Sequence, residues 1–412
     1  MNSMAQEVLE YVEENDVKFI RLAFSDLFGN QKNISIMPRE LPYALEHGKS
    51  FDGSAVEGFL NTEESDLLLF PDPTTLSFLP WRPSHGRVVR LYCDIMRPDG
   101  THFEGDGRYI LKKAVNRLKE LGFICNVGIE CEFYLFELDE KGNPTCIPHD
   151  HAGYCDIAPL DKGENVRREI CLTLEQMDIQ PESSHHEKGP GQNEIDFRYS
   201  DALSAADNLM TFETVVRTIA ARNGLYASFD PKPLKDASGN GMHINLSLWR
   251  GEENIFKAGQ EHSQEAESFI AGIMEHIQEI TLFLNPTEES YQRFGEFEAP
   301  KYISWSHGNR SQLIRIPPAQ PGHIRMELRS PDSTCNPYYA LALLLWAGAE
   351  GIEGKYELCP PCNENLNHRE AEGLKMLPQS LEQAAKVAMN SPLVHKVLPE
   401  IVLKKFAEKH IQ

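Results

Sequence analysis

Apolar and polar residues alternate along residues 128–136, whose sequence is Gly-Ile-Glu-Cys-Glu-Phe-Tyr-Leu-Phe. Successive side chains of a β-strand point to opposite faces, so Cys131 and Phe133 can pack in a core. Glu130 and Glu132 then share the other face, where like charges repel each other unless a cation lies between them. A single pair of this kind is also what a solvent-exposed strand shows, so this segment alone predicts only a strand.

A second polar segment covers residues 185–197. The Gly-Pro-Gly sequence at 189–191 is a turn signal, and it places Glu187 and Glu194 on the two legs of one predicted hairpin.

Two further segments repeat the strand pattern. Residues 239–248 place His243, Asn245 and Ser247 on one strand face, opposite an apolar face. Residues 325–329, Arg-Met-Glu-Leu-Arg, place their three charged side chains on one face.

Each polar face could be a solvated surface, but four such faces in one domain predict a common site. The acidic and imidazole side chains form a ligand set that suits Mg²⁺ or Mn²⁺ rather than thiolate-bound zinc. Six ligands suit two metal ions that share substrate oxygens, an arrangement that stabilises phosphoryl transfer. The predicted ligands are Glu130, Glu132, Glu187, Glu194, His243 and Glu327.

Arginines concentrate between residues 293 and 329. Within residues 309–317, two arginines accompany apolar and proline-rich sequence that should be partly buried, and a buried guanidinium needs an anion. The set predicted to bind carboxylate or phosphate is Arg293, Arg310, Arg315, Arg325 and Arg329.

Two differently patterned regions meet at the turn sequence Arg-Pro-Asp-Gly, residues 97–100. We predict an α+β protein with a small β-rich domain over 1–97 and a large catalytic domain over 98–412. Short strands are expected at 17–24 and 88–95 in the first domain. Helices are expected in the second at 110–121, at 201–223, at 337–351 and from Ser380 to before Pro392.

Composition narrows the class of partner. The 412-residue chain has 40 basic and 62 acidic residues and a net charge of −22, which argues against nucleic acid or an anionic membrane as partner. We expect no signal peptide and no membrane-spanning segment, because no apolar run has the required length. Nine scattered cysteines without a framework spacing suit a reducing cytoplasm.

The chain resembles glutamine synthetase of the bacterial class I type over nearly its whole length. The segments that carry the resemblance are 26–29, 51–59, 64–66, 130–133, 185–187, 191–194, 241–243, 297–300, 309–310 and 325–329. The resemblance implies a β-grasp N-terminal domain and a catalytic domain whose curved antiparallel sheet lines a funnel. It also implies ATP as co-substrate, with glutamate and ammonium.

The resemblance further implies residue roles. One metal ion is assigned to Glu132, Glu187 and Glu194, and a second to Glu130, His243 and Glu327. The expected glutamate contacts are Ser238, where the family usually has Asn, together with Gly239, Arg293, Glu298, Arg310 and Arg329. The expected ATP contacts are Glu182, Tyr199, Asn245, Ser247, Arg310, Arg315 and Arg325. The expected catalytic residues are Asp52, which binds ammonium, Glu298, a flap carboxylate that shields the intermediate, Arg310 and Arg315.

The resulting hypothesis is an ATP-dependent glutamate–ammonia ligase that forms glutamine through γ-glutamyl phosphate. One alternative is a γ-glutamyl ligase for an organic amine or polyamine, because Ala55 slightly widens the loop of Asp52. Asp52 favours ammonium, since that cation needs a carboxylate to bind and deprotonate it. The other alternative is a catalytically silent structural relative, which would usually have lost metal ligands.

The resemblance also implies assembly. In the family, the Asp52 loop of one subunit completes the active site of the next in a hexameric ring. We therefore expect a homo-oligomer with shared active sites. The family's two rings are joined by a C-terminal segment, and this sequence ends at Gln412, before the matching part. We expect ring hexamers and a dodecamer that is weaker or held by other contacts.

Overall fold

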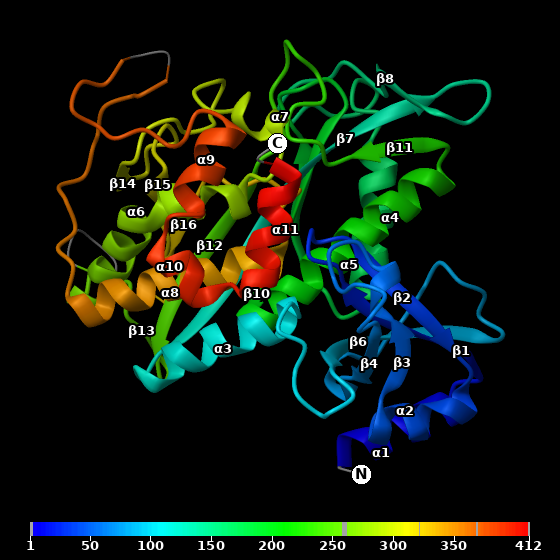
Figure 1. Ribbon diagram of the computed structural model, residues 1–412. Helices are drawn as coiled ribbons and strands as arrows, with labels where there is room; N and C mark the ends of the chain where they lie inside the picture. The colour runs from blue at the N-terminus through cyan, green and yellow to red at the C-terminus, as the bar shows by residue number, and fades with distance from the viewer. Residues whose placement is uncertain (1–2, 258–261, 321, 368–369, 411–412) are drawn as a thin grey trace.

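The computed structural model describes residues 3–257, 262–320, 322–367 and 370–410 of the chain. Its strands form two sheets, and helices pack against both, which confirms the α+β class (Figure 1). In Figure 1 the N-terminal sheet, in blue, lies to one side of the larger part of the chain.

The smaller sheet has six strands. β1 (Val17–Ser25) and β6 (Arg87–Met96) are its parallel central pair, close to the strands expected at 17–24 and 88–95. The order is β2-β1-β6-β4-β3, and the short strand β5 pairs with β6. The remaining bounds are β2 (Gln31–Ile36), β3 (Lys49–Asp52), β4 (Asp66–Pro71), β5 (Ser77–Phe78), α1 (Ser3–Glu14) and α2 (Leu41–His47).

The larger sheet has ten strands, and its main order is β14-β15-β16-β12-β7-β10-β9. Within this sheet, all pairs of described strands are antiparallel except β14–β15 at the edge. β8 and β11 pair with β7, and β13 pairs with β12. The bounds are β7 (Ile124–Leu138), β8 (Pro144–Pro148), β9 (Pro181–His186), β10 (Gln192–Asp201), β11 (Leu225–Ser228), β12 (Met242–Arg250), β13 (Glu253–Asn254), β14 (Trp305–His307), β15 (Ile314–Ile316) and β16 (Met326–Leu328).

The four expected helices are present as α3 (Gly107–Glu120), α5 (Ala202–Arg222), α8 (Pro337–Gly354) and α9 (Leu381–Ala388), the last capped by Ser380. The other helices are α4 (Glu164–Glu175), α6 (Gln264–Leu284), α7 (Glu288–Tyr291), α10 (Pro392–Val397) and α11 (Glu400–His410). α6 and α8 touch through glycines, because a Cβ added to Gly272 would lie 2.3 Å from the carbonyl oxygen of Ala347.

The two faces of the larger sheet have different environments. Cys131 and Phe133 of β7 are fully buried, and the ring of Phe133 meets that of Phe212 of α5 at 6.2 Å. Glu130 and Glu132 alternate with them and point to the opposite face, as the period of two predicts. The helices therefore cover one face, and the acidic face is left for a site.

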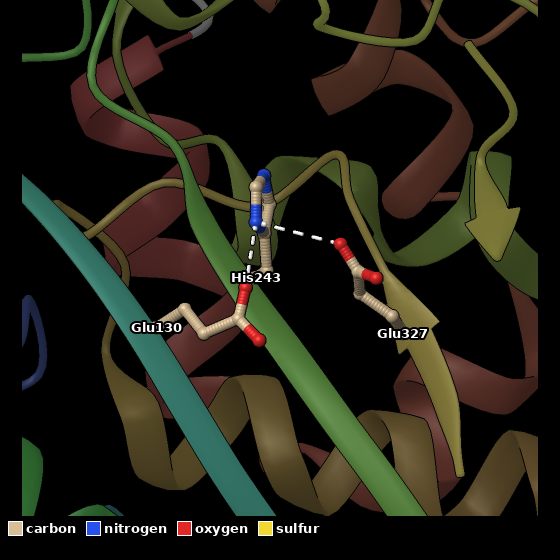
Figure 2. A group of neighbouring side chains, drawn as sticks. All are labelled: Glu130, His243 and Glu327. Carbon is tan, nitrogen blue, oxygen red and sulfur yellow. Dashed lines mark hydrogen bonds and ion pairs between the residues drawn. The ribbon is translucent and has the colours of Figure 1, made fainter. Parts of the chain in front are cut away.

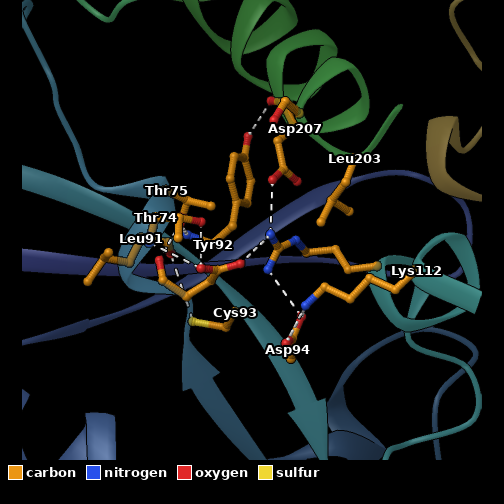
Figure 3. Close-up of polar contacts among 12 residues, drawn as sticks. Thr74, Thr75, Leu91, Tyr92, Cys93, Asp94, Lys112, Leu203 and Asp207 are labelled. Carbon is orange, nitrogen blue, oxygen red and sulfur yellow. Dashed lines mark hydrogen bonds and ion pairs between the residues drawn. The ribbon is translucent and has the colours of Figure 1, made fainter. Parts of the chain in front are cut away.

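A buried arginine joins the two parts of the chain. Arg108, at the start of α3, donates hydrogen bonds to Asp72 (2.9 Å) and Asp94 (3.1 Å) of the N-terminal part. It also donates to Asp207 of α5 at 3.1 Å. Figure 3 shows Asp94, Asp207 and Tyr92 at this junction, where the Tyr92 hydroxyl donates to the carbonyl of Asp207 at 3.1 Å. One cation with only 3% of its side chain exposed therefore binds carboxylates from both parts.

Candidate active site

A cavity of about 600 Å³ opens on the acidic face of the larger sheet. Its walls come from β7, β12, β15 and the turn between β9 and β10, and from the loop at 293–300. Five of the six expected metal ligands line it: Glu130, Glu132, Glu187, Glu194 and His243. The sixth, Glu327, is almost fully buried beside them at 1% exposure.

Strand register brings the first group of ligands together. Glu130 of β7 lies directly opposite His243 of β12, and β16 follows on the other side of β12. The Nδ1 atom of His243 lies 3.1 Å from Glu130 Oε2 and 3.6 Å from Glu327 Oε1. Figure 2 shows these three side chains pointing toward one another. One ligand atom from each lies within 4.8 Å of the others, so the three can hold one metal ion.

The second group forms around the β9–β10 turn. His185, Glu187 and Glu194 bring one ligand atom each within 4.8 Å of the others. Glu132 lies opposite Glu194 across the β7–β10 ladder and accepts a hydrogen bond from the Gly241 amide at 2.8 Å. The structure thus adds His185 to the expected set, and its position two residues before Glu187, in the sequence His-His-Glu, was a usable signal for it.

The carboxylates of the site repel one another. Burial raises the pKa of Glu194 well above its usual range, and the charges of Glu132 and Asp196 raise it further. Burial likewise raises the pKa of Glu132 to about 7, although His243 opposes the shift. Bound divalent cations would offset this repulsion, and carboxylate oxygens with an imidazole are a suitable donor set for a hard cation. The residues present therefore fit the metals that were expected.

Asp196 is an acidic residue of the site that the sequence reasoning missed. It lies opposite Glu130 in the β7–β10 ladder and lines the cavity. One of its oxygens lies within 4.8 Å of ligand atoms of Glu130 and Glu194. Its position two residues after Glu194 on the same strand was a usable signal.

Arginines line the same cavity beside these acidic residues. Arg329 is 2% exposed and pairs with Glu327, which also accepts from Arg315 Nη1 at 2.6 Å. Arg293 is 3% exposed, and burial lowers its pKa. Burial opposes ionisation of Glu327, but the charges of His243 and Arg329 lower its pKa overall. These arginines therefore form a cationic wall of the cavity, next to the acidic strands.

The neighbouring residues narrow the cavity near Arg293. A Cβ added to Gly239 would lie 2.3 Å from the Pro231 carbonyl oxygen and 2.7 Å from Arg293 Cγ, so only glycine fits there. The Ser238 hydroxyl donates to Gln192 Oε1 at 2.5 Å. Arg310 also lines the cavity but is exposed.

A second cavity of about 320 Å³ adjoins the first. The two share Glu130, Asp196 and Arg325 in their linings. Arg325 Nε donates to Asn245 Oδ1 and Asn245 Nδ2 donates to Glu130 Oε1, each at 2.9 Å. Five of the expected ATP contacts line this cavity: Glu182, Tyr199, Asn245, Ser247 and Arg325. Arg310 and Arg315 line the first cavity instead, and Trp249 and His323 are lining residues that the sequence reasoning missed.

The last two expected residues, Glu298 and Asp52, lie in different parts of the structure. Glu298 belongs to the loop at 293–300 and lines the first cavity. Asp52 lies at the end of β3 on the exposed surface of the N-terminal part, and within the described residues neither cavity includes it in its lining. Its side chain accepts hydrogen bonds from the amide and hydroxyl of Ser54, at 2.9 and 2.6 Å.

Further lining residues of the first cavity that the sequence reasoning missed include Tyr154, Lys188 and Lys232. The Tyr154 ring packs edge-on against His185, with centroids 5.4 Å apart.

None of the described helices is long and apolar enough to cross a membrane.

Comparison with known proteins shows which family this chain belongs to. The model for the β-grasp domain of glutamine synthetase matches residues 16–98, and the model for the catalytic domain of glutamine synthetase matches residues 104–411. A glutamine synthetase of Clostridium saccharobutylicum is 46% identical, covering 96% of this chain and 92% of its own. One from Methanosarcina mazei is 47% identical, covering 97% and 92%.

Solved structures show the same fold. A structure described as a GmaS/ADP complex is 29% identical with a TM-score of 0.89, covering 98% of this chain and 94% of its own. A Plasmodium falciparum glutamine synthetase is 25% identical with a TM-score of 0.87, covering 99% and 95%. The expected β-grasp fold is thereby confirmed, and the chain belongs to the glutamine synthetase family, the ATP-dependent ligases that join glutamate and ammonia.

Proposed function

We propose that the two joined cavities hold glutamate and ATP end to end, with the paired carboxylate strands at their junction. The observation that carries this proposal is the shared wall of Glu130, Asp196 and Arg325. The cationic wall of the first cavity suits the carboxylates of glutamate. The smaller second cavity suits a nucleotide, and the similar GmaS structure is described as a complex with ADP.

The reaction then has two steps. An oxygen of the glutamate γ-carboxylate attacks the γ-phosphorus of ATP, and ADP leaves. Ammonia next attacks the acyl carbon of γ-glutamyl phosphate, and phosphate leaves as glutamine forms. Arg315 and Arg310 stabilise negative charge on the transferred group, while Arg293, Arg329 and the narrow floor at Gly239 orient glutamate.

We assign two divalent cations, Mg²⁺ or Mn²⁺, to the site. Glu130, His243 and Glu327 would hold one ion, and Glu187 and Glu194 with Glu132 the other, with His185 beside them. When bound, such cations neutralise charge on the phosphates. Burial opposes ionisation of Glu130, but the contact with His243 and the hydrogen bond from Asn245 lower its pKa overall.

Asp52 and Glu298 are assigned to the second step. Ammonium is not a nucleophile until it loses a proton, so a carboxylate is needed close to the acyl carbon. Because Asp52 is exposed and lies outside both cavities of its own chain, we propose that it serves the site of a neighbouring subunit. The assembly would be a homo-oligomeric ring of six subunits, with a dodecamer possible.

The domain boundary and the location are also proposals. We divide the chain at residue 97, just before the turn that leads to Arg108. We place the protein in a reducing cytoplasm because its nine cysteines are all free thiols, several of them exposed, such as Cys146 and Cys359.

The test is direct. Purified protein with Mg²⁺, ATP, glutamate and ammonia should form glutamine and release one phosphate for each glutamine. Comparison of ammonia with methylamine and a polyamine distinguishes the ammonia ligase from an organic-amine ligase. Failure to form any γ-glutamyl amide with metal and ATP present would contradict the proposal.

A further inference from the structure

The loop at 293–300 forms a compact turn beside the first cavity. The Gly295 amide donates to the Ala299 carbonyl at 3.0 Å, and the Ala299 amide donates to the Glu296 carbonyl at 3.0 Å. Phe297, between them, has a φ of +52°, in the left-handed region that is strained for a residue with a side chain. These hydrogen bonds hold the turn together as one unit, and Glu298 follows directly after Phe297.

Lys188 contacts Glu298 from across the cavity. It is the residue after Glu187 in the β9–β10 turn, and its Nζ lies 2.5 Å from Glu298 Oε1. The backbone amide of Lys188 donates to Glu187 Oε2 at 3.0 Å. Lys188 is therefore tied to an expected metal ligand through its backbone and to the loop through its side chain.

Two other cations face the same loop. Arg329 Nη2 lies 3.8 Å from the second oxygen of Glu298. Lys232 Nζ lies 4.8 Å from the centroid of the Phe297 ring and donates to the Ala237 carbonyl at 2.6 Å. Lys188 differs from both because it approaches from the β9–β10 turn.

The Lys188–Glu298 pair is half-exposed, with 43% and 38% of the side chains accessible. Pairs of this exposure add little to the stability of a fold. The pair therefore matters for its place at the mouth of the cavity and not for the stability of the fold. The contact can open and close without disturbing the sheet.

We propose that Lys188 is a positioning residue that holds Glu298 across the mouth of the cavity and so keeps water from the acyl phosphate. This inference rests on the proposed ligase activity. If the loop opens after the first step, water attacks the acyl carbon in place of ammonia. The carbon–oxygen bond to phosphate then breaks, and glutamate and phosphate leave, so that ATP is consumed without formation of glutamine.

The experiment measures phosphate and glutamine in the same reaction for the full-length protein. The variants are Lys188→Met, which removes the charge at similar length, and Lys188→Arg, which keeps it. Lys141→Met is the matched control, because Lys141 is an exposed lysine in the turn after β7. The wild type, the control and Lys188→Arg should release one phosphate per glutamine. For Lys188→Met the ratio should rise about threefold to tenfold, and the midpoint of thermal unfolding should not change.

Several outcomes would overturn the inference. An unchanged ratio in Lys188→Met shows that the pair does not exclude water. Loss of phosphate release together with glutamine shows that Lys188 acts in the first step instead. If the wild type itself makes no glutamine, the proposed function fails, and this result is distinct from a failure of the Lys188 variants alone.

Discussion

At the residue scale, Glu327 is the most constrained acidic side chain of the site. It contacts His243, Arg315 and Arg329 while almost fully buried. Its charge therefore balances two guanidinium groups, and in the proposed site it would also hold a metal ion.

We expect Glu327→Gln to lower kcat by at least about 100-fold, because a ligand and a charge partner are lost together. Manganese affinity, measured by calorimetry, should fall in parallel. The exposed Glu382→Gln on α9 is the control and should leave both quantities unchanged. If Glu327→Gln kept the kcat of the wild type, Glu327 would be excluded as a metal ligand.

Asp52→Ala should separate the two chemical steps. We expect the rate with ammonia to fall about tenfold or more, because general-base assistance is lost. Formation of the γ-glutamyl hydroxamate from hydroxylamine should change much less, since that nucleophile is uncharged at pH 7. Asp99→Ala is a matched control, because Asp99 accepts from Thr101 as Asp52 accepts from Ser54. An equal loss of rate with both nucleophiles would show that Asp52 does not assist the second step.

The sequence allowed some of these residues to be predicted, and the reason is physical. A strand period of two places Glu130 and Glu132 on one face from local sequence alone. The close approach of Lys188 to Glu298 joins residues 110 positions apart, and no periodicity encodes it. If Asp52 serves a neighbouring subunit, as proposed, neither the periodicity of the sequence nor the cavities of a single chain can show its role.

At the element scale, the junction at the start of α3 decides how the two sheets are held. Arg108→Met would leave Asp72, Asp94 and Asp207 without their common cation. We expect the free energy of unfolding to fall by about 3–5 kcal/mol, as for other broken buried charge pairs. The urea midpoint measures this, and the exposed Arg39→Met is the control. A change within the error of the control would show that the junction is not stabilising.

Asp106 caps α3 and gives this junction a pH dependence. Burial, with the charge of Asp94, raises the pKa of its carboxyl to about 7 in the folded protein, above its ordinary value of 3.8. Between pH 4 and 7 the unfolded chain therefore releases a proton that the folded protein retains, and stability falls as pH rises. In Asp106→Asn this pH dependence disappears. From the lower to the upper end of that window, the free energy of unfolding of the variant should therefore rise relative to that of the wild type by at most about 4 kcal/mol. Urea midpoints at several pH values test this, and parallel curves would contradict it.

At the scale of the whole molecule, a shared site predicts complementation between inactive subunits. Asp52→Ala and Glu327→Gln damage different halves of a site if Asp52 serves a neighbour. After dissociation and random reassembly of equal amounts, roughly a quarter of the sites should contain two intact halves and regain activity with ammonia. Mass photometry should show rings of six subunits, or dodecamers made of two such rings. A mixture no more active than its components would place both residues in the same chain's site.

The register of β7 has a consequence for how this gene can change. Glu130 faces His243, and Cys131, the next residue, packs in the core. Insertion or deletion of one codon within β7 would exchange the two faces, so that carboxylates would enter the core and a thiol and aromatic rings would enter the cavity. Point substitutions can alter this site gradually, but length variation in its central strand is tolerable only in steps of two residues. Relatives that differ in length should therefore carry their insertions in the loops.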